Sequence, residues 1–136
     1  AELATTSLVA APYASALAAT TAEDRQAGVL CVDIGAGTTQ IALFAHGHLL
    51  LCDVIPVGGN HVTFDIARAL ATTLPEAERI KRNSGCAVGR MVGDEEEIEV
   101  PGVGGHAPRK AARRVLSDII EPRVEELYAM VQKTNG

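Results

Sequence analysis

Three short apolar runs between Gly28 and Pro56 constrain the fold of this chain most strongly. They span residues 29–32, 41–44 and 49–55. Each has the length and the Val, Ile and Leu content of a β-strand. Only residues 33–40 and 45–48 lie between them, and connections this short join antiparallel neighbours. The sequence therefore predicts a three-stranded antiparallel meander.

Apolar residues at helical spacing predict most of the remaining chain. We expect helices over residues 13–20, 62–74, 76–83, 111–120 and 123–131. Residues 21–24 should form only the end of the first helix and lead into the first strand. Pro75 suits the start of the third helix, and Pro122 should kink or separate the last two because proline lacks a backbone N–H group. Residues 86–103 alternate apolar and polar side chains, which indicates one or two short strands. With 3% aromatic residues, the core must consist of Val, Ile, Leu and Ala, which suits an α/β fold.

The charge and the cysteines argue against two classes of protein. The net charge of −5 argues against a broad nucleic-acid surface, because polyanion binding needs an excess of Lys and Arg. Cys31, Cys52 and Cys86 are odd in number and form no CxxC pair, which indicates thiols in a reducing cytoplasm rather than a disulfide framework. The uncharged stretch 3–22 is diluted by Thr, Ser and Pro, so we interpret it as neither an export signal nor a membrane span.

The connection between the first two predicted strands has the composition of an anion-binding turn. It reads Asp33-Ile34-Gly35-Ala36-Gly37-Thr38-Thr39. Glycines permit unusual φ angles and let an anion approach the backbone N–H groups, while the threonines add hydroxyl donors and Asp33 a carboxylate that suits hydrated Mg²⁺. No Lys follows the glycines and a strand follows the turn, so this is neither a P-loop nor a dinucleotide fingerprint. The alternative is a tight hairpin capped by Asp33.

Several further stretches, in a fixed order, carry a resemblance that covers nearly the whole chain. They are residues 7–15, 55–67, 77–81, 85–87 and 120–123. With the turn, they resemble the FtsA family of bacterial cell-division proteins, within the actin, heat-shock chaperone and sugar-kinase superfamily. The resemblance implies a fragment that forms half of an actin-like (ribonuclease H-like) α/β ATPase. It implies a nucleotide-binding lobe of residues 1–67 and 120–136, with a smaller lobe, residues 68–119, inserted in it.

The resemblance also implies a site for ATP and Mg²⁺. The expected cofactor contacts are Asp33, Gly35, Ala36, Gly37, Thr38, Thr39, Gly58, Gly59, Asn60, Glu78 and Lys81. The turn matches positions that hold the β- and γ-phosphates, Asp33 the one near Mg²⁺, and Glu78 with Lys81 those that contact ribose and adenine. The glycines before Asn60 should begin a helix, whose free N–H groups favour anions. From the residues alone, Asn60 could equally be an ordinary cap, and Glu78 with Lys81 a surface ion pair.

Two residues depart from the family pattern. Ala36 stands where a middle glycine is usual, which is tolerable if that residue does not need a positive φ. Gln40 stands where an acid is common, which removes a second carboxylate for metal binding or water activation. No residue is a convincing general base, so we expect ATP binding with at most slow hydrolysis.

Four basic residues after Pro108 form a second predicted site. Arg109, Lys110, Arg113 and Arg114 are expected on one helix, as a cationic stripe that could receive an acidic or C-terminal peptide. The resemblance implies that the small lobe binds the C-terminal tail of the tubulin-like protein FtsZ. It further implies self-association into filaments, in the cytoplasm at the inner face of the bacterial cell membrane, with attachment through parts outside this chain. The alternative for the stripe is a solvated helix face.

Two other functions are compatible with the residues. One is a true enzyme of the same fold, a sugar-kinase-like phosphotransferase or a chaperone-like ATPase, although the sequence shows no substrate-facing acid. The other is an interaction domain that binds no nucleotide and whose glycine turn is only a hairpin. An ATP-dependent scaffold of cell division is the hypothesis that accounts for the ordered motifs as a set.

Overall fold

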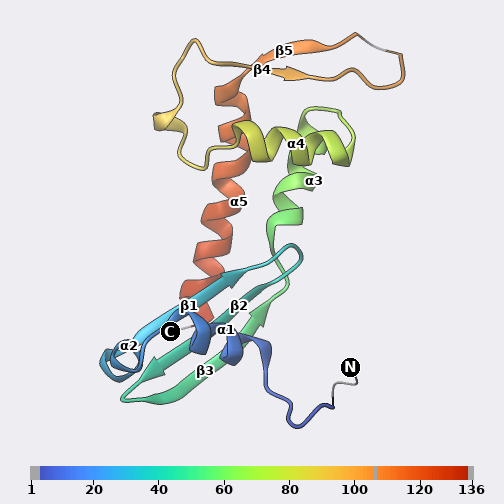
Figure 1. Cartoon of the computed structure of the whole chain (residues 1–136). Helices are drawn as coiled ribbons and strands as arrows, with labels where there is room; N and C mark the ends of the chain where they lie inside the picture. The colour runs from blue at the N-terminus through green and yellow to red at the C-terminus, as the bar shows by residue number, and fades with distance from the viewer. Residues whose placement is uncertain (1–3, 106, 135–136) are drawn as a thin grey trace.

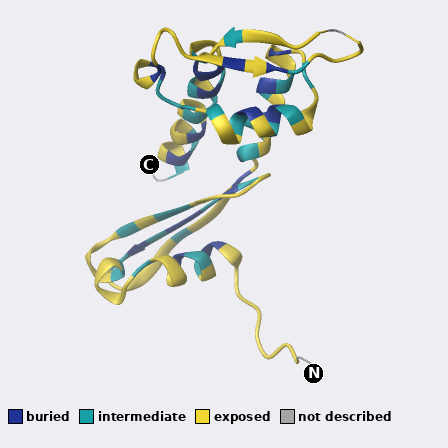
Figure 2. Ribbon diagram, turned by 45° about the horizontal axis from the view of Figure 1, so that its top comes forward, coloured by how far each residue is buried: buried dark blue, intermediate teal, exposed yellow. Residues whose placement is uncertain are grey.

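The computed structural model, which describes residues 4–105 and 107–134, has a three-stranded sheet at one end and a bundle of helices with a β-hairpin at the other (Figure 1). In the described part of the chain, two segments join the ends. They are helix α3 (Gly59–Ala69), which follows the sheet, and the long helix α5 (Arg113–Thr134). Buried residues form separate clusters at the two ends instead of a single core (Figure 2).

The sheet is the predicted antiparallel meander, which confirms the strand assignments. Its strands are β1 (Val29–Ile34), β2 (Thr39–Ala45) and β3 (His48–Ile55), in the order β1-β2-β3. His46 and Gly47 join β2 to β3 with φ of 52° and 76°, the left-handed conformations that a two-residue hairpin favours. Side chains alternate across the sheet, so Ile41 packs with residues of α5 while Ala42 and Phe44 lie on the opposite face.

Helix α1 (Ala11–Ala19) covers that opposite face and confirms the first predicted helix. Its Ala16 is fully buried against Ala42 and Phe44. The Tyr13 ring lies 5.8 Å from the Phe44 ring. Helix α1 is thus fixed to the sheet by apolar contacts on one side.

Helix α2 (Ala22–Ala27) was not predicted, since we expected only an exit from the first helix. Thr21 Oγ1 accepts a hydrogen bond from the Asp24 N–H group, and the Asp24 carboxylate accepts one from the Thr21 N–H group. This reciprocal capping box satisfies two donors that a helix start leaves open. It begins a helix of only 6 residues, too short for apolar spacing to indicate.

The helical end is more divided than the sequence indicated. Its elements are α3, α4 (Leu74–Ser84), a 3₁₀ helix (Gly89–Met91), β4 (Glu97–Val100) and β5 (Arg109–Ala112). We expected one helix over residues 62–74, but α3 ends at Ala69 and Thr73 caps α4, with Pro75 in its first turn as predicted. Ala71 between them has φ of 49°, which a right-handed helix does not allow. The buried core of this end comprises Ile66, Leu70, Ala77, Ile80, Ile98, Val100, Leu116 and Ile120.

Helix α5 runs continuously through both ends of the molecule. We expected Pro122 to kink or separate two helices, and the prediction of two helices was wrong, because the structure has one helix of 22 residues with Pro122 inside it. Leu116 and Ile120 are buried in the helical end, and Leu127 and Val131 are buried against the sheet. Burying side chains on both sides of the proline outweighs its cost of about 3 kcal/mol in a helix interior. Among the described residues, no helix has the length and the hydropathy that a membrane crossing requires.

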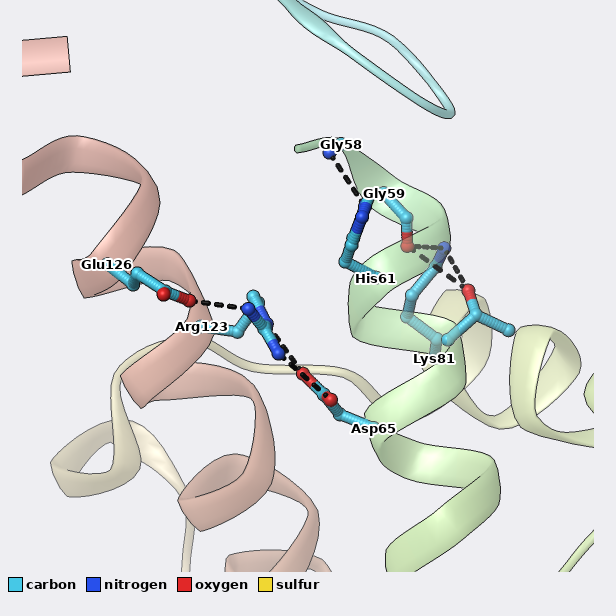
Figure 3. A network of polar contacts seen from close by, with 8 residues as sticks. Gly58, Gly59, His61, Asp65, Lys81, Arg123 and Glu126 are labelled. Carbon is cyan, nitrogen blue, oxygen red and sulfur yellow. Dashed lines mark hydrogen bonds and ion pairs between the residues drawn. The ribbon is translucent and has the colours of Figure 1, made fainter. Parts of the chain in front are cut away.

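An ion pair joins α5 to α3 between the two ends. Arg123 donates from Nε to Asp65 Oδ2 at 2.7 Å and from Nη2 to Asp65 Oδ1 at 3.1 Å (Figure 3). Such a two-bond pair fixes the relative orientation of the two helices. The lobe boundaries that we expected after residues 67 and 119 fall inside α3 and α5, so continuous helices cross both of them.

Candidate functional site

The predicted phosphate turn connects β1 to β2 and is largely exposed. The Gly35 N–H group donates to Thr38 O at 2.9 Å, which closes the turn. No described residue accepts a hydrogen bond from the N–H groups of Ala36, Gly37 or Thr38. A Cβ atom on Gly37 would meet nothing within 4 Å, so the space beside it is open. Three consecutive backbone donors therefore lack acceptors among the described residues, and the space beside Gly37 is open to an anion.

Glycine serves this turn through its small size and not through an unusual backbone conformation. We expected the glycines to supply unusual φ angles, but neither Gly35 nor Gly37 has a positive φ. Ala36 has none either, so its replacement of the usual glycine is tolerated. The close approach falls at Gly58, where a Cβ atom would lie 2.6 Å from Gly35 O and 2.8 Å from Thr38 N. A side chain at Gly58 would therefore push the two turns apart.

The start of α3 is bonded directly to the phosphate turn. The Gly59 N–H group donates to Gly35 O at 2.9 Å, and the Asn60 N–H group donates to Ala36 O at 2.7 Å. We expected the first N–H groups of this helix to be free for an anion, and for these two the expectation was wrong. Their partners are the carbonyl groups of the turn, so the helix start holds the turn in place.

Two further contacts fix this junction. Thr39 is fully buried and its Oγ1 donates to Val57 O at 2.8 Å. The hydroxyl that we expected to face a phosphate instead holds β2 to the segment that leads into α3. The Gly58 N–H group donates to His61 Nδ1 at 3.1 Å (Figure 3), so the imidazole, and not the Asn60 side chain, is the acceptor at this helix start.

Asp33 lies beside the turn, one residue before β1 ends. Ser15 of α1 donates from Oγ to Asp33 Oδ2 at 2.8 Å. Across the ladder Asp33 faces Gln40, whose Oε1 is buried without a hydrogen-bond partner in the described part of the chain. The described residues contain no group of three or more His, Cys, Asp or Glu side chains that could hold a metal. A single carboxylate fits Mg²⁺, which keeps most of its waters and shares phosphate oxygens.

Glu78 and Lys81 on α4 are more than a surface ion pair. Lys81 Nζ lies 2.6 Å from Glu78 Oε2 and donates to Thr63 Oγ1 at 2.8 Å. It also donates to Gly59 O at 3.1 Å (Figure 3). The Lys81 ammonium, and next the Thr63 hydroxyl at 2.5 Å, hold the pKa of Glu78 below its ordinary value. This network attaches α4 to the start of α3. The predicted ATP-site residues are therefore joined from the turn to α4.

A pocket of about 330 Å³ lies between α3 and α4, beside this network. It is lined by Asn60, Thr63, Phe64, Leu74, Pro75 and Glu78. Phe64 and Leu74 are 54% and 45% exposed and line the same pocket, so together they offer an apolar surface to a ligand or a partner. The sequence analysis missed Thr63 and Phe64. Thr63 lies four residues after Gly59 and Phe64 four residues after Asn60, and this spacing was a usable signal, because a side chain one helical turn onward shares a face with the helix start.

The four basic residues do not form one helical stripe. Arg109 and Lys110 belong to β5, and Arg113 and Arg114 begin α5. The expectation was wrong because residues 109–112 pair with β4, where side chains alternate between faces.

Each basic side chain has a different partner. Lys110 Nζ contacts Glu97 Oε2 at 2.8 Å, and Arg109 donates to Leu70 O at 2.9 Å. Arg113 donates to Ser84 O at 2.8 Å and pairs with Glu96. Arg114 forms one ion pair with the described residues, a weak contact of 3.6 Å with Asp118, and lines a pocket of about 450 Å³. Sequence reasoning did not identify the other pocket residues, which are Ala87, Val88, Arg90, Glu121, Val124, Glu125 and Tyr128.

Solved structures with the same architecture have an actin-like fold. MreB5 of Spiroplasma citri, crystallised bound to AMPPNP, superposes with a TM-score of 0.67 at 24% identity, over 91% of this chain and 39% of that one. A chain of the PilM–PilN type IV pilus biogenesis complex gives a TM-score of 0.56 at 25% identity, over 82% of this chain and 25% of that one. These likenesses confirm the predicted fold class.

Sequence comparison identifies the family. The cell division protein FtsA of Escherichia coli K12 is 46% identical over 126 residues, which are 93% of this chain and 30% of that protein. FtsA of Pseudomonas aeruginosa is 44% identical over 119 residues, which are 88% of this chain and 28% of that protein. The chain thus spans less than a third of the length of these relatives. A family model described as cell division protein FtsA matches residues 30–135. This chain therefore belongs to the FtsA family of cell division proteins.

Proposed function

We propose that this chain supplies one wall of an ATP site in an actin-like scaffold of cell division. The observation that carries the proposal is the junction of two glycine turns, where Gly58 packs against Gly35 and Thr38. The junction leaves the N–H groups of Ala36, Gly37 and Thr38 without acceptors among the described residues. Consecutive N–H groups of this kind bind anions. The ATP analogue bound to MreB5, which shares the fold, supports a nucleotide phosphate as the anion.

Each part of ATP meets a different group of residues in this proposal. The β- and γ-phosphates accept hydrogen bonds from the turn, and Asp33 holds hydrated Mg²⁺, which offsets the phosphate charge. The base and ribose occupy the pocket of about 330 Å³, whose apolar side chains suit a flat ring and whose Glu78 suits hydroxyl groups. Lys81, held by three oxygen atoms, orients Glu78 and the start of α3.

Binding, and not rapid turnover, suits this wall. The residue opposite Asp33 is Gln40, and a carboxamide cannot accept a proton from an attacking water. We therefore assign ATP a structural role. The bound nucleotide contacts both the residues of this chain and residues of the protein outside it, and this favours self-association into filaments. The site of action is the inner face of the cell membrane at the division site, and attachment uses parts of the protein outside these residues. Membership of the FtsA family supports this assignment.

Titration calorimetry on the full-length protein tests the nucleotide site. We expect wild type to bind Mg-ATP and Asp33→Ala to bind it about tenfold or more weakly, because a charged ligand to the hydrated metal is lost. Asp53→Ala is the matched control, since Asp53 is an exposed aspartate of the same sheet whose carboxylate accepts only from the Val54 N–H group among the described residues. Wild type that binds no Mg-ATP would exclude the proposal, and fast multiple turnover would favour an enzyme of the same fold.

Of the four basic residues, Arg114 lines the pocket of about 450 Å³, and we propose that the C-terminal tail of FtsZ docks there. Arg90 and Arg114 are exposed there beside Tyr128, over an apolar floor that includes Val88 and Val124. The exposed arginines can bind an acidic group of a peptide and Tyr128 its apolar anchor, while Glu121 and Glu125 in the same lining disfavour a peptide that is acidic throughout. The FtsA membership of this chain supports FtsZ as the source of the peptide.

Fluorescence anisotropy with a labelled FtsZ tail peptide tests this docking site on the full-length protein. We expect Arg114→Glu to weaken binding about tenfold or more, because it reverses a charge beside the peptide. Lys110→Glu is the control, because Lys110 is already paired with Glu97 on the separate β-hairpin. Equal weakening by the two variants would indicate a general charge effect and would count against a specific pocket.

A further inference from the structure

The Asp33 side chain lies on the face of the sheet that α1 covers. Successive side chains of a strand point to opposite faces, so Asp33 shares a face with Val29 and Cys31. Both of these pack against the cluster around Ala16 of α1. Val32, the residue directly before Asp33, packs instead on the opposite face, against the cluster that contains residues of α5. Among the described elements, α1 is therefore the one placed to orient the Asp33 carboxylate from outside the sheet.

Ser15 on α1 is placed to do this. It precedes Ala16, which is fully buried against the sheet, so packing fixes the position of the Ser15 backbone. Its Oγ donates to Asp33 Oδ2 at 2.8 Å, across 18 residues of sequence. A serine inside a helix commonly bonds to a carbonyl of its own preceding turn. The Ser15 hydroxyl instead leaves its helix and contacts Asp33 on the neighbouring strand.

The other neighbours of Asp33 do not restrain it. Gln40 stands opposite in the ladder, yet no hydrogen bond joins the two side chains in the described structure. Asp33 itself is exposed, and the side chain of an exposed aspartate rotates freely about χ1 and χ2 unless a partner holds it. With Oδ2 held by Ser15, Oδ1 is the oxygen left for a hydrated cation.

We propose that Ser15 is a positioning residue that holds the Asp33 carboxylate in the orientation required by the Mg²⁺ of the bound nucleotide. This inference rests on the proposed ATP site. It adds to the site a residue of α1 that lies outside both glycine turns. The role of this residue concerns binding of the metal and not of the phosphates. The consequence is specific: loss of the hydroxyl weakens nucleotide binding only when Mg²⁺ is present.

The test measures ATP affinity of the full-length protein by calorimetry, once with Mg²⁺ and once with EDTA. We expect Ser15→Ala to reduce the ratio of the two affinities about three- to tenfold, the loss that one ordinary, solvent-exposed hydrogen bond produces. The affinity in EDTA should stay at the wild-type value. Alanine has a higher helix propensity than serine, so the substitution does not disfavour α1. Ser15→Thr keeps the hydroxyl and should restore the ratio.

Ser7→Ala is the matched control, because it removes a hydroxyl from the exposed segment before α1 and should leave both affinities unchanged. A Mg²⁺ effect of wild-type size in Ser15→Ala would overturn the inference while leaving the ATP site intact. Equal weakening with and without Mg²⁺ would also overturn it, since it would indicate a general structural role. Wild type that fails to bind ATP under both conditions would overturn the proposed function together with the inference.

Discussion

The phosphate turn and the four basic residues lie in different parts of the molecule and are built from different groups. Backbone atoms shape the turn, where N–H groups, carbonyl groups and the missing side chain of Gly58 decide the geometry. The basic residues are shaped by long side chains whose partners come from other elements, such as Glu97 for Lys110 and Ser84 O for Arg113. Consecutive residues encode a backbone turn, whereas packing between elements selects side-chain partners. The first kind of site can therefore be predicted from sequence more fully than the second.

The largest expected effect comes from adding a methyl group to one glycine of the junction. Gly58→Ala should destabilise the protein by about 2–3 kcal/mol, because the added Cβ meets backbone atoms that cannot move away cheaply. Gly37→Ala should change stability by less than about 0.5 kcal/mol, since its Cβ enters open space, yet it should weaken ATP binding. Urea unfolding and calorimetry measure the two quantities. Equal destabilisation by both variants would contradict the idea that the close backbone approach at Gly58 determines the geometry of the turn.

A smaller effect is expected from removing one lysine at each site. Lys81→Met should cost about 1–2 kcal/mol, because it removes the ammonium group that Glu78, Thr63 and the Gly59 carbonyl share in a partly buried network. Lys110→Met should have no measurable effect, since the Lys110 side chain is 75% exposed and its single ion pair is solvated. Urea unfolding midpoints compare the two. A larger loss for Lys110→Met would contradict the idea that only the first site is structurally coupled.

The smallest predicted effect is the pH dependence of stability, which we compare at Glu78 beside the phosphate turn and at Glu96 beside the basic residue Arg113. The pKa of Glu78 is lowered chiefly by Lys81, and the pKa of Glu96 is lowered by the Gly93 N–H group and then by Arg113. A carboxylate with a lowered pKa stabilises the fold above its unfolded pKa, and the gain disappears as the pH falls through the folded value. Stability should therefore decline from about pH 5 downward.

Variants show which carboxylate is responsible for that decline. Glu78→Gln should lower stability at pH 7 and remove part of the dependence on acid, so that its difference from wild type shrinks toward pH 3.5. Glu96→Gln should do so to a lesser extent, because Glu96 is in contact with solvent. Thermal unfolding at intervals between pH 7 and pH 3.5 provides the curves. A pH-independent gap for Glu78→Gln would show that its charge is not the stabilising feature.

Local signals account for the parts of the fold that were predicted. The three strands follow from apolar runs with tight connections, and Pro75 marks the start of α4. The glycines at positions 58 and 59 mark the junction of β3 and α3. Each of these features is contained within a few consecutive residues, where propensity and turn chemistry decide the outcome.

Tertiary contacts account for the parts that could not be predicted. Pro122 reads as a break, and only the buried residues on both sides of it keep α5 continuous. Arg109 and Lys110 read as helical until β4 is available to pair with them. The Thr39 hydroxyl faces Val57 and Ser15 faces Asp33, each across 18 residues of sequence, and no local pattern encodes such contacts.

Helix α5 also determines how the two ends can move. The sheet and the helical end are joined at only two places in the described chain, the Gly58 turn before α3 and the middle of α5 near Pro122. A peptide bond to proline provides no N–H group, so α5 lacks one rung of its hydrogen-bond ladder between the two clusters it enters. The Arg123–Asp65 pair lies next to that weak point. The two crossings define a single axis, and a rotation about this axis would leave the buried clusters at both ends intact.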